Sequence, residues 1–138
     1  MLAEEEVNCV MCNLGEEEDI DHLFFSCPFA QQCWQKLNVT WDNTQNLATR
    51  VSAARSQYPG PFFMEISLIA SWENWKLRTR KVFDNVSPRC ATWFSNFKNQ
   101  CRLQSERFKV DDRSSFCVWL TLLVKVNFYL VCTFFHPL

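Results

Sequence analysis

Four residues near the amino terminus constrain the fold of this chain more than any other feature. Cys9 and Cys12 are separated by two residues. Nine residues separate Cys12 from His22, and four separate His22 from Cys27. Three thiolates and one imidazole can complete a tetrahedral shell around Zn²⁺, and a shell with no open position is the structural kind of zinc site. We therefore predict a structural zinc site at these four residues. The alternative is that the three cysteines are ordinary thiols and His22 is a surface histidine.

The residues around this pattern favour a loop followed by a helix. Gly15 can adopt the positive φ that turns the chain back after the cysteine pair. We expect residues 21–37 to be helical with an interruption near Cys27, because Pro28 suits the first turn of a new helix. Apolar residues then recur at four-residue spacing, which predicts that this helix packs over the metal loop. These residues are Phe29, Cys33 and Leu37, with Trp34 alongside.

The run Asp21–Ala30, which reads DHLFFSCPFA, and the Cys-Trp pair after it resemble a known family. They are similar to the zinc-binding region near the carboxyl end of plant non-LTR (LINE-type) reverse transcriptases. In that family a cysteine pair precedes an acidic stretch, His-Leu-Phe, Cys-Pro-Phe-Ala and a tryptophan, and the order is the same here. The segment Ile69–Arg78 is similar to the one that usually follows. The resemblance implies a zinc-binding fragment of a retrotransposon-derived protein that has no catalytic activity of its own and at most weak nucleic-acid binding.

Composition favours one small, mainly α-helical domain. The chain has 138 residues, 48% of them hydrophobic, and only two glycines. A chain so poor in turn-forming residues suits helices better than a many-stranded sandwich. We expect a small zinc knuckle plus a helix, then a helical hairpin, then an apolar carboxyl-terminal tail. The segments expected are an acidic disordered lead at 1–8, the zinc knuckle and helix at 9–37, a polar linker at 38–61, the hairpin at 62–110 and the tail at 111–138.

Spacing and breaks give finer expectations inside these segments. Within the linker, Leu47 to Ala54 is expected to form one short helix. The sequence Tyr-Pro-Gly-Pro at 58–61 is a strong break. A helix is then expected from about Phe62 to Phe83, on an apolar series that includes Trp72 and Trp75. Ser87-Pro88 is typical of an N-cap followed by proline, and predicts a third helix that runs to about residue 107.

The tail allows several interpretations. Residues 124–131 alternate Val, Phe and Leu with Lys125, Asn127 and others, which is typical of a strand. Residues 116–135 have about the length that spans a bilayer, but Lys125 near the centre opposes insertion. We therefore do not expect a membrane to be the partner of this tail. A buried segment and a chance extension of the coding frame remain the alternatives.

Charge is distributed unevenly along the chain. Residues 1–27 hold eight of the fifteen acidic residues and none of the fourteen basic ones. Because cations drive nucleic-acid affinity, the zinc segment is a poor candidate for gripping a phosphate backbone. RNA or DNA is expected instead at the basic residues of the helix predicted from about Phe62 to Phe83, namely Lys76, Arg78, Arg80 and Lys81. The alternative is that these four residues form a solvated helix face. The acidic segment could pair with the basic one, within a chain or between two copies.

The amino-terminal sequence bears on location. It runs from Met-Leu-Ala at residues 1–3 directly into three glutamates, with no basic start and no apolar export run. We therefore expect an intracellular protein of the cytoplasm or nucleus, not a secreted one, with reduced thiols.

No catalytic residues are predicted. If His22 binds metal, His136 is the one histidine that remains, so a nucleophile–histidine–acid arrangement is hard to build. Asp111-Asp112 lies in a polar stretch and lacks the aromatic flank of a polymerase signature. The cysteines outside the zinc pattern are expected to be inert packing residues, namely Cys33, Cys90, Cys101, Cys117 and Cys132. The alternatives to a zinc-binding retrotransposon-derived fragment are a small zinc-scaffolded protein-interaction module and a tail-anchored membrane peptide.

Overall fold

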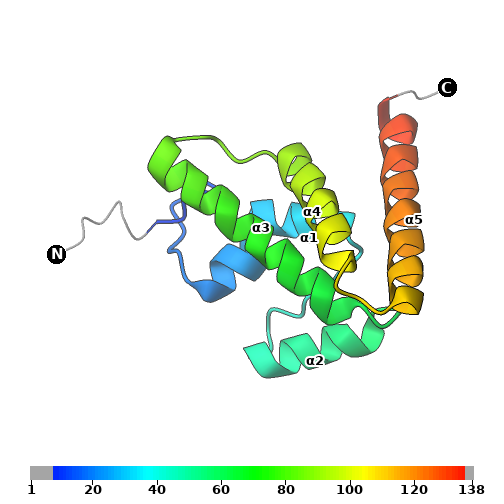
Figure 1. Ribbon diagram of the computed structural model, residues 1–138. Helices are drawn as coiled ribbons and strands as arrows, with labels where there is room; N and C mark the ends of the chain where they lie inside the picture. Colours follow the sequence, from blue (N-terminus) through cyan, green and yellow to red (C-terminus); the bar gives the residue numbers. More distant parts are fainter. Residues whose placement is uncertain (1–7, 136–138) are drawn as a thin grey trace. The chain divides into compact units, whose positions relative to one another are not determined.

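The backbone of residues 8–135 and the side chains of residues 8–123 are described by a computed structural model. The elements in chain order are η2 (His22–Ser26), α1 (Pro28–Lys36), α2 (Leu47–Gln57), α3 (Phe63–Asp84), α4 (Cys90–Ser105) and α5 (Val110–Phe135) (Figure 1). Between residues 8 and 135 the β pairing is limited to an isolated antiparallel bridge that joins Asn8 to Glu17. The expected mainly helical class is therefore confirmed. The predicted acidic lead lies outside the described residues, apart from Asn8.

The chain divides into two compact units, residues 1–97 and 98–138. The first unit contains η2, α1, α2, α3 and the beginning of α4. The second contains the end of α4 and all of α5. The candidate zinc ligands all lie in the first unit.

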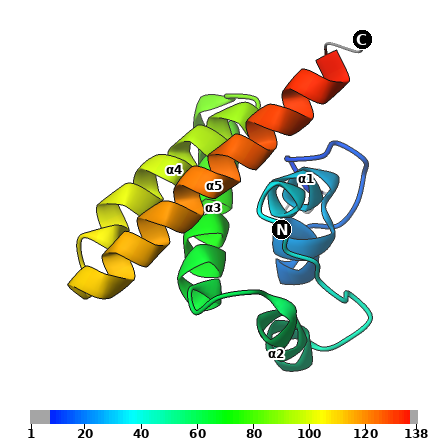
Figure 2. The same ribbon diagram turned by 90° about the vertical axis from the view of Figure 1, so that its right-hand side faces the viewer.

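Helix α1 forms as the apolar spacing predicts. Pro28 is its first residue, where a missing N–H costs nothing. Its apolar face is buried, and so is Leu37, which caps the carboxyl end of the helix. The helix contacts η2 and α3. Figures 1 and 2 show α1 beside α3 from two sides. The buried residues are Phe29, Ala30, Cys33, Trp34 and Leu37.

Helix α3 lies within one residue of the predicted range, but its buried face differs from the predicted apolar series. Trp72 and Trp75 are 53% and 40% exposed, whereas the polar Glu73 and Asn74 between them are buried. The buried positions repeat three or four residues apart along one side of the helix, and both tryptophans lie one residue off that side. Apolar spacing therefore predicted the helix and missed the orientation of its carboxyl-terminal half.

Helix α4 begins at Cys90, so the prediction that it begins at Ser87-Pro88 is wrong. Asn85 ends α3 in the left-handed conformation, and the N–H of Val86 bonds back to the Arg80 carbonyl. The chain uses residues 86–89 to reverse direction, so the first α4 bond runs from the Trp93 N–H to the Arg89 carbonyl.

The indole of Trp93 fastens the first part of α4 to α3. Its Nε1 donates to the Ala70 carbonyl at 3.3 Å, and its ring stacks on Phe97. Both rings are fully buried. The predicted hairpin of two helices therefore has a specific contact at its core.

The carboxyl-terminal tail is helical, so its prediction as a strand is wrong. Helix α5 buries Phe116, Leu120 and Leu123, which recur at helical spacing. Asp111 and Asp112 lie in its first turn, where the helix dipole favours negative charge. The alternation that suggested a strand has apolar residues on both sides, so it does not exclude a helix. Among the described residues, no helix has the length and apolarity needed to cross a bilayer.

The left-handed residue at the end of α3 gives a test of the hairpin turn. Asn85 has φ 53°, a conformation that costs a residue with a Cβ about 1–2 kcal/mol and that glycine adopts freely. We predict that Asn85→Ala lowers the free energy of unfolding by about 1 kcal/mol, while Asn85→Gly leaves it unchanged or slightly higher. Thermal unfolding of the three proteins compares them. Equal losses in both variants would show that the turn conformation is not what the asparagine provides.

Candidate metal centre

Two of the candidate ligands come from a tight turn at residues 9–12. The chain reverses through Asn13 and Gly15, which have φ values of 55° and 75°. The Cys9 N–H then bonds to the Glu16 carbonyl at 2.8 Å, which closes the loop. The Met11 N–H points at the Cys9 sulfur at 3.4 Å. Gly15 was expected in this role from the sequence, whereas Asn13 was not.

The other two ligands flank a π-helical turn. In a regular α-helix, residues five apart point about 140° away from each other. In η2 the Cys27 N–H bonds instead to the His22 carbonyl at 2.7 Å, five residues back. This wider turn brings the two side chains to the same side. Single π-turns of this kind occur often at functional sites.

The π-turn leaves backbone carbonyls that other side chains satisfy. Asn74 Nδ2, buried on α3, donates to the Leu23 carbonyl at 3.0 Å. Trp34 Nε1, on α1, donates to the Phe24 carbonyl at 2.7 Å. Since an unpaired buried carbonyl costs about 1–3 kcal/mol, these two bonds stabilise the turn. They also explain why the polar Asn74 lies in the core.

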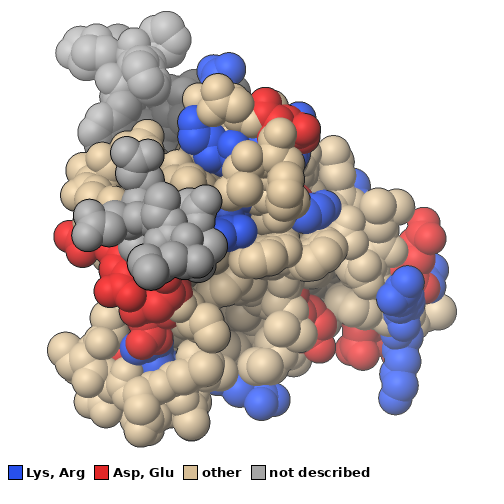
Figure 3. Space-filling view, turned by 90° about the vertical axis from the view of Figure 1, so that its left-hand side faces the viewer, with Lys and Arg blue, Asp and Glu red and all other residues tan. Residues whose placement is uncertain are grey.

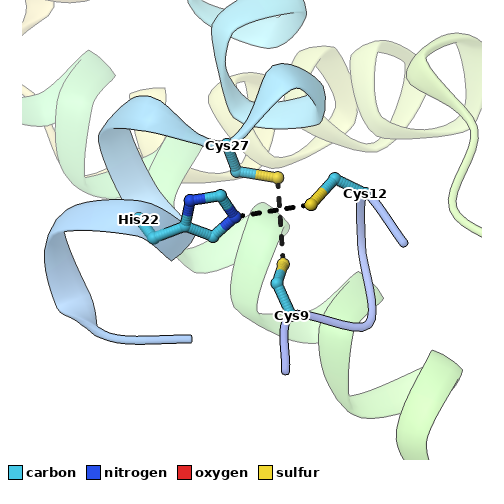
Figure 4. A group of neighbouring side chains, drawn as sticks. All are labelled: Cys9, Cys12, His22 and Cys27. Atoms are coloured by element: carbon cyan, nitrogen blue, oxygen red, sulfur yellow. Dashed lines mark hydrogen bonds between the residues drawn. The ribbon is translucent and has the colours of Figure 1, made fainter. Parts of the chain in front are cut away.

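The four ligand atoms converge on one point (Figure 4). All of them lie within 4.8 Å of one another. The sulfurs of Cys9 and Cys27 are 3.9 Å apart, and Cys12 Sγ is 3.4 Å from His22 Nε2. A tetrahedral zinc with Zn–S bonds of about 2.3 Å has S–S edges of about 3.8 Å and S–N edges of about 3.5 Å. The spacing of the four atoms therefore fits a zinc ion at their centre.

The histidine ring is oriented by a neighbouring hydroxyl. Ser26 Oγ lies 3.4 Å from the Asp21 carbonyl, to which it donates, and 3.5 Å from His22 Nδ1. With its proton directed to that carbonyl, the Ser26 oxygen can accept from Nδ1–H in the tautomer that leaves the lone pair of the ring on Nε2. Nε2 is the atom that faces Cys12. Metal-binding histidines are commonly fixed by such a second contact.

The buried thiols need a cation to ionise. Burial raises the pKa of Cys27 to about 12 and also raises the pKa of Cys9, although backbone N–H groups that point at both sulfurs act in the opposite direction. A bound Zn²⁺ supplies the positive charge that converts such thiols into thiolates, and metal binding then releases their protons.

Arg50 supports the site, although no sequence pattern pointed to it. It lies on α2 within the predicted linker and is only 3% exposed. Its Nη1 is 2.9 Å from Asp21 Oδ1, and its guanidinium lies over the Phe25 ring. It also donates to the carbonyls of Asp42 and Gln45. Arg50 thereby links Asp21, the residue before His22, to α2.

The four basic residues predicted for nucleic-acid binding lie on α3 and are partly engaged. Arg78 forms an ion pair with Glu18 of the acidic loop at 2.6 Å, and Lys76 lies 2.7 Å from the buried Glu73. Lys81 donates to the side chain of Asn85, and Arg80 is exposed. The expected pairing of acidic and basic segments thus occurs within the chain. On the face in Figure 3, described basic and acidic side chains are interspersed rather than gathered into one basic patch.

Residues 1–34 match the family model described as zinc-binding in reverse transcriptase. That range contains the cysteine pair, His22 and Cys27. No curated protein and no solved structure matches the chain. The matched family and the converging donors agree on zinc.

The Arg50 contacts generate a test of the site's support. We predict that Arg50→Met lowers the free energy of unfolding by about 2 kcal/mol and weakens zinc binding, because it removes a charged donor from three acceptors. Arg55→Met is the matched control, since Arg55 is exposed on the same helix. Chemical denaturation and zinc competition with a chromogenic chelator give the two readouts. If the two variants behave alike, Arg50 does not position the site.

Proposed function

We propose that Cys9, Cys12, His22 and Cys27 bind one Zn²⁺ in a closed structural site, and that this ion stabilises a binding module without catalytic activity. The observation that carries the proposal is the convergence of the four donor atoms within 4.8 Å, with the Cys9–Cys27 and Cys12–His22 distances close to the edges of a zinc tetrahedron. A catalytic zinc keeps one position for water or substrate. With three sulfurs and one nitrogen, no such position remains.

The match of residues 1–34 supports an origin in a retrotransposon reverse transcriptase. We infer that the chain is a zinc-binding fragment derived from such a protein. The zinc segment itself would serve to hold η2 and α1 in place. Binding to a partner would then fall to the surfaces that this segment supports, of which α3 is the nearest.

Removal of one ligand tests the zinc assignment. We predict that Cys12→Ser or His22→Ala releases the ion and unfolds residues 9–37, because zinc contributes roughly 10–16 kcal/mol in small zinc domains and trimming one core residue costs only about 2–5 kcal/mol. Cys33→Ser, a buried thiol outside the ligand set, should retain both zinc and fold. Native mass spectrometry counts the metal, and limited proteolysis detects the unfolding. Equal zinc retention in Cys12→Ser and the parent protein would exclude the site.

Single-stranded RNA or DNA is the partner we propose for α3. From its middle to its end, α3 exposes aromatic rings. Trp72 is 53% exposed with Lys76 Nζ 6.0 Å from the centre of its ring, and Phe83 is 78% exposed. Exposed aromatic side chains next to basic ones can stack bases and neutralise phosphates. Two of the four basic residues already have acidic partners, so the expected binding is weak.

Fluorescence anisotropy with a labelled 20-nucleotide single strand tests this surface. With Arg80 and Lys81 as the phosphate contacts, the logarithm of the association constant should fall against that of salt concentration with a slope of about −1.4. Trp72→Ala should weaken binding at least about five-fold, because base stacking is worth about 1–3 kcal/mol. Leu68→Ala is the control, since Leu68 is an exposed apolar residue one turn earlier on α3. Equal effects of the two variants, or no binding, would favour a protein partner instead.

A further inference from the structure

A pocket lies beside the π-turn, between η2, α1 and the segment that follows α1. Its volume is about 280 Å³. Since drug-sized ligands occupy pockets of about 300–1,000 Å³, this one suits a single ring system rather than a whole nucleotide. Its apolar lining consists of Phe25, Trp34, Val39 and Trp41, of which the first three are buried.

The ring of Trp41 is fixed by the aromatic rings around it. It lies edge-on to Phe25 and Trp34, with ring centres 5.0 and 5.1 Å away, and it also contacts Phe63. Trp41 Nε1 is buried and has no hydrogen-bond acceptor among residues 8–123. A buried indole N–H usually has one. The residue that borders the pocket therefore carries an unused donor.

The polar residues of the pocket are uncharged. Gln31 and Gln35 lie one turn apart on α1, and Thr40 and Asn43 belong to the segment after it. All four are exposed, so they form the rim of the pocket above its buried apolar floor. Each carboxamide offers a donor and an acceptor side by side. Because none of the described lining residues is charged, the pocket favours a flat, neutral ligand with a donor next to an acceptor.

We propose that this pocket binds one unpaired adenine base. Adenine is flat and uncharged, and it presents its N6 amino group beside the N7 acceptor, the pair to which Asn and Gln side chains bind. Guanine is read chiefly by Arg or Lys and cytosine by Asp or Glu, and the described lining has no such residue. Proteins bind unpaired bases in this manner, with aromatic rings against the base and hydrogen bonds to its edge. The site goes beyond the surface proposed for α3, because none of its lining residues belongs to that helix.

Titration of the full, zinc-loaded chain with adenosine tests the pocket. Adenosine has no phosphate, so the result does not depend on Arg80 or Lys81. We expect a saturable shift of the Trp41 indole N–H signal in a two-dimensional ¹⁵N NMR spectrum, and an affinity that changes little with salt because the ligand is neutral. Inosine, in which a carbonyl replaces the amino group, should bind at least about five-fold more weakly, because it cannot make the bidentate contact.

A pair of rim substitutions with a matched control locates the site. The double variant Gln31→Ala/Gln35→Ala should weaken adenosine binding at least about five-fold. Gln32→Ala is the control, since Gln32 is an exposed glutamine of the same helix outside the pocket lining. These are surface changes, so zinc content and the dispersion of the NMR spectrum should match those of the parent protein. Trp72→Ala should leave adenosine binding unchanged, so failure of the pocket and failure of the α3 surface are told apart.

Adenylate and uridylate single strands of equal length identify the source of the base. Tighter binding of the adenylate strand supports a base within a strand, whereas equal binding of the two strands by a protein that binds adenosine supports the free nucleoside. The proposal is overturned if adenosine gives no saturable shift, or if inosine or uridine binds as tightly as adenosine. It is also overturned if the double variant and Gln32→Ala bind adenosine alike.

Discussion

The convergence of three sulfurs and one nitrogen is the constraint on which the first unit depends. The knuckle at 9–12 and the π-turn at 22–27 bring buried thiols together, and burial raises the pKa values of Cys9 and Cys27. Protonated thiols would attract one another only weakly. A divalent cation at their centre would stabilise the thiolates and would thereby hold the knuckle and the π-turn together.

The surroundings of the site are arranged around this convergence. Asn74 and Trp34 satisfy carbonyls that the π-turn leaves free, and Ser26 orients the histidine ring. Two ion pairs, from Arg50 and Arg78, neutralise part of an acidic segment that carries no cation of its own. The same pairs remove a cation from α3 and limit the positive charge available there for nucleic acid. Part of the basic charge of the chain is therefore neutralised by its own zinc-binding segment.

How much the sequence predicts depends on the range of the interaction. The ligand spacing, the proline at the start of α1 and the break before α3 act over a few residues, and each prediction agrees with the structure. The burial of Asn74 and Arg50 depends on partners up to 51 residues away, and no local pattern reveals it. The start of α4 was placed too early because the reversal after Asn85 needs four residues. The strand interpretation of the tail failed because its alternating residues are apolar on both sides, so the pattern does not separate a strand from a helix.

X-ray absorption at the zinc edge of the purified protein tests the central claim most directly, because it reports the atoms bound to the metal rather than the consequence of removing them. The account predicts one zinc per chain, with three sulfurs at about 2.3 Å and one nitrogen at about 2.0–2.1 Å. A shell dominated by oxygen, or one with fewer than three sulfurs, would contradict it.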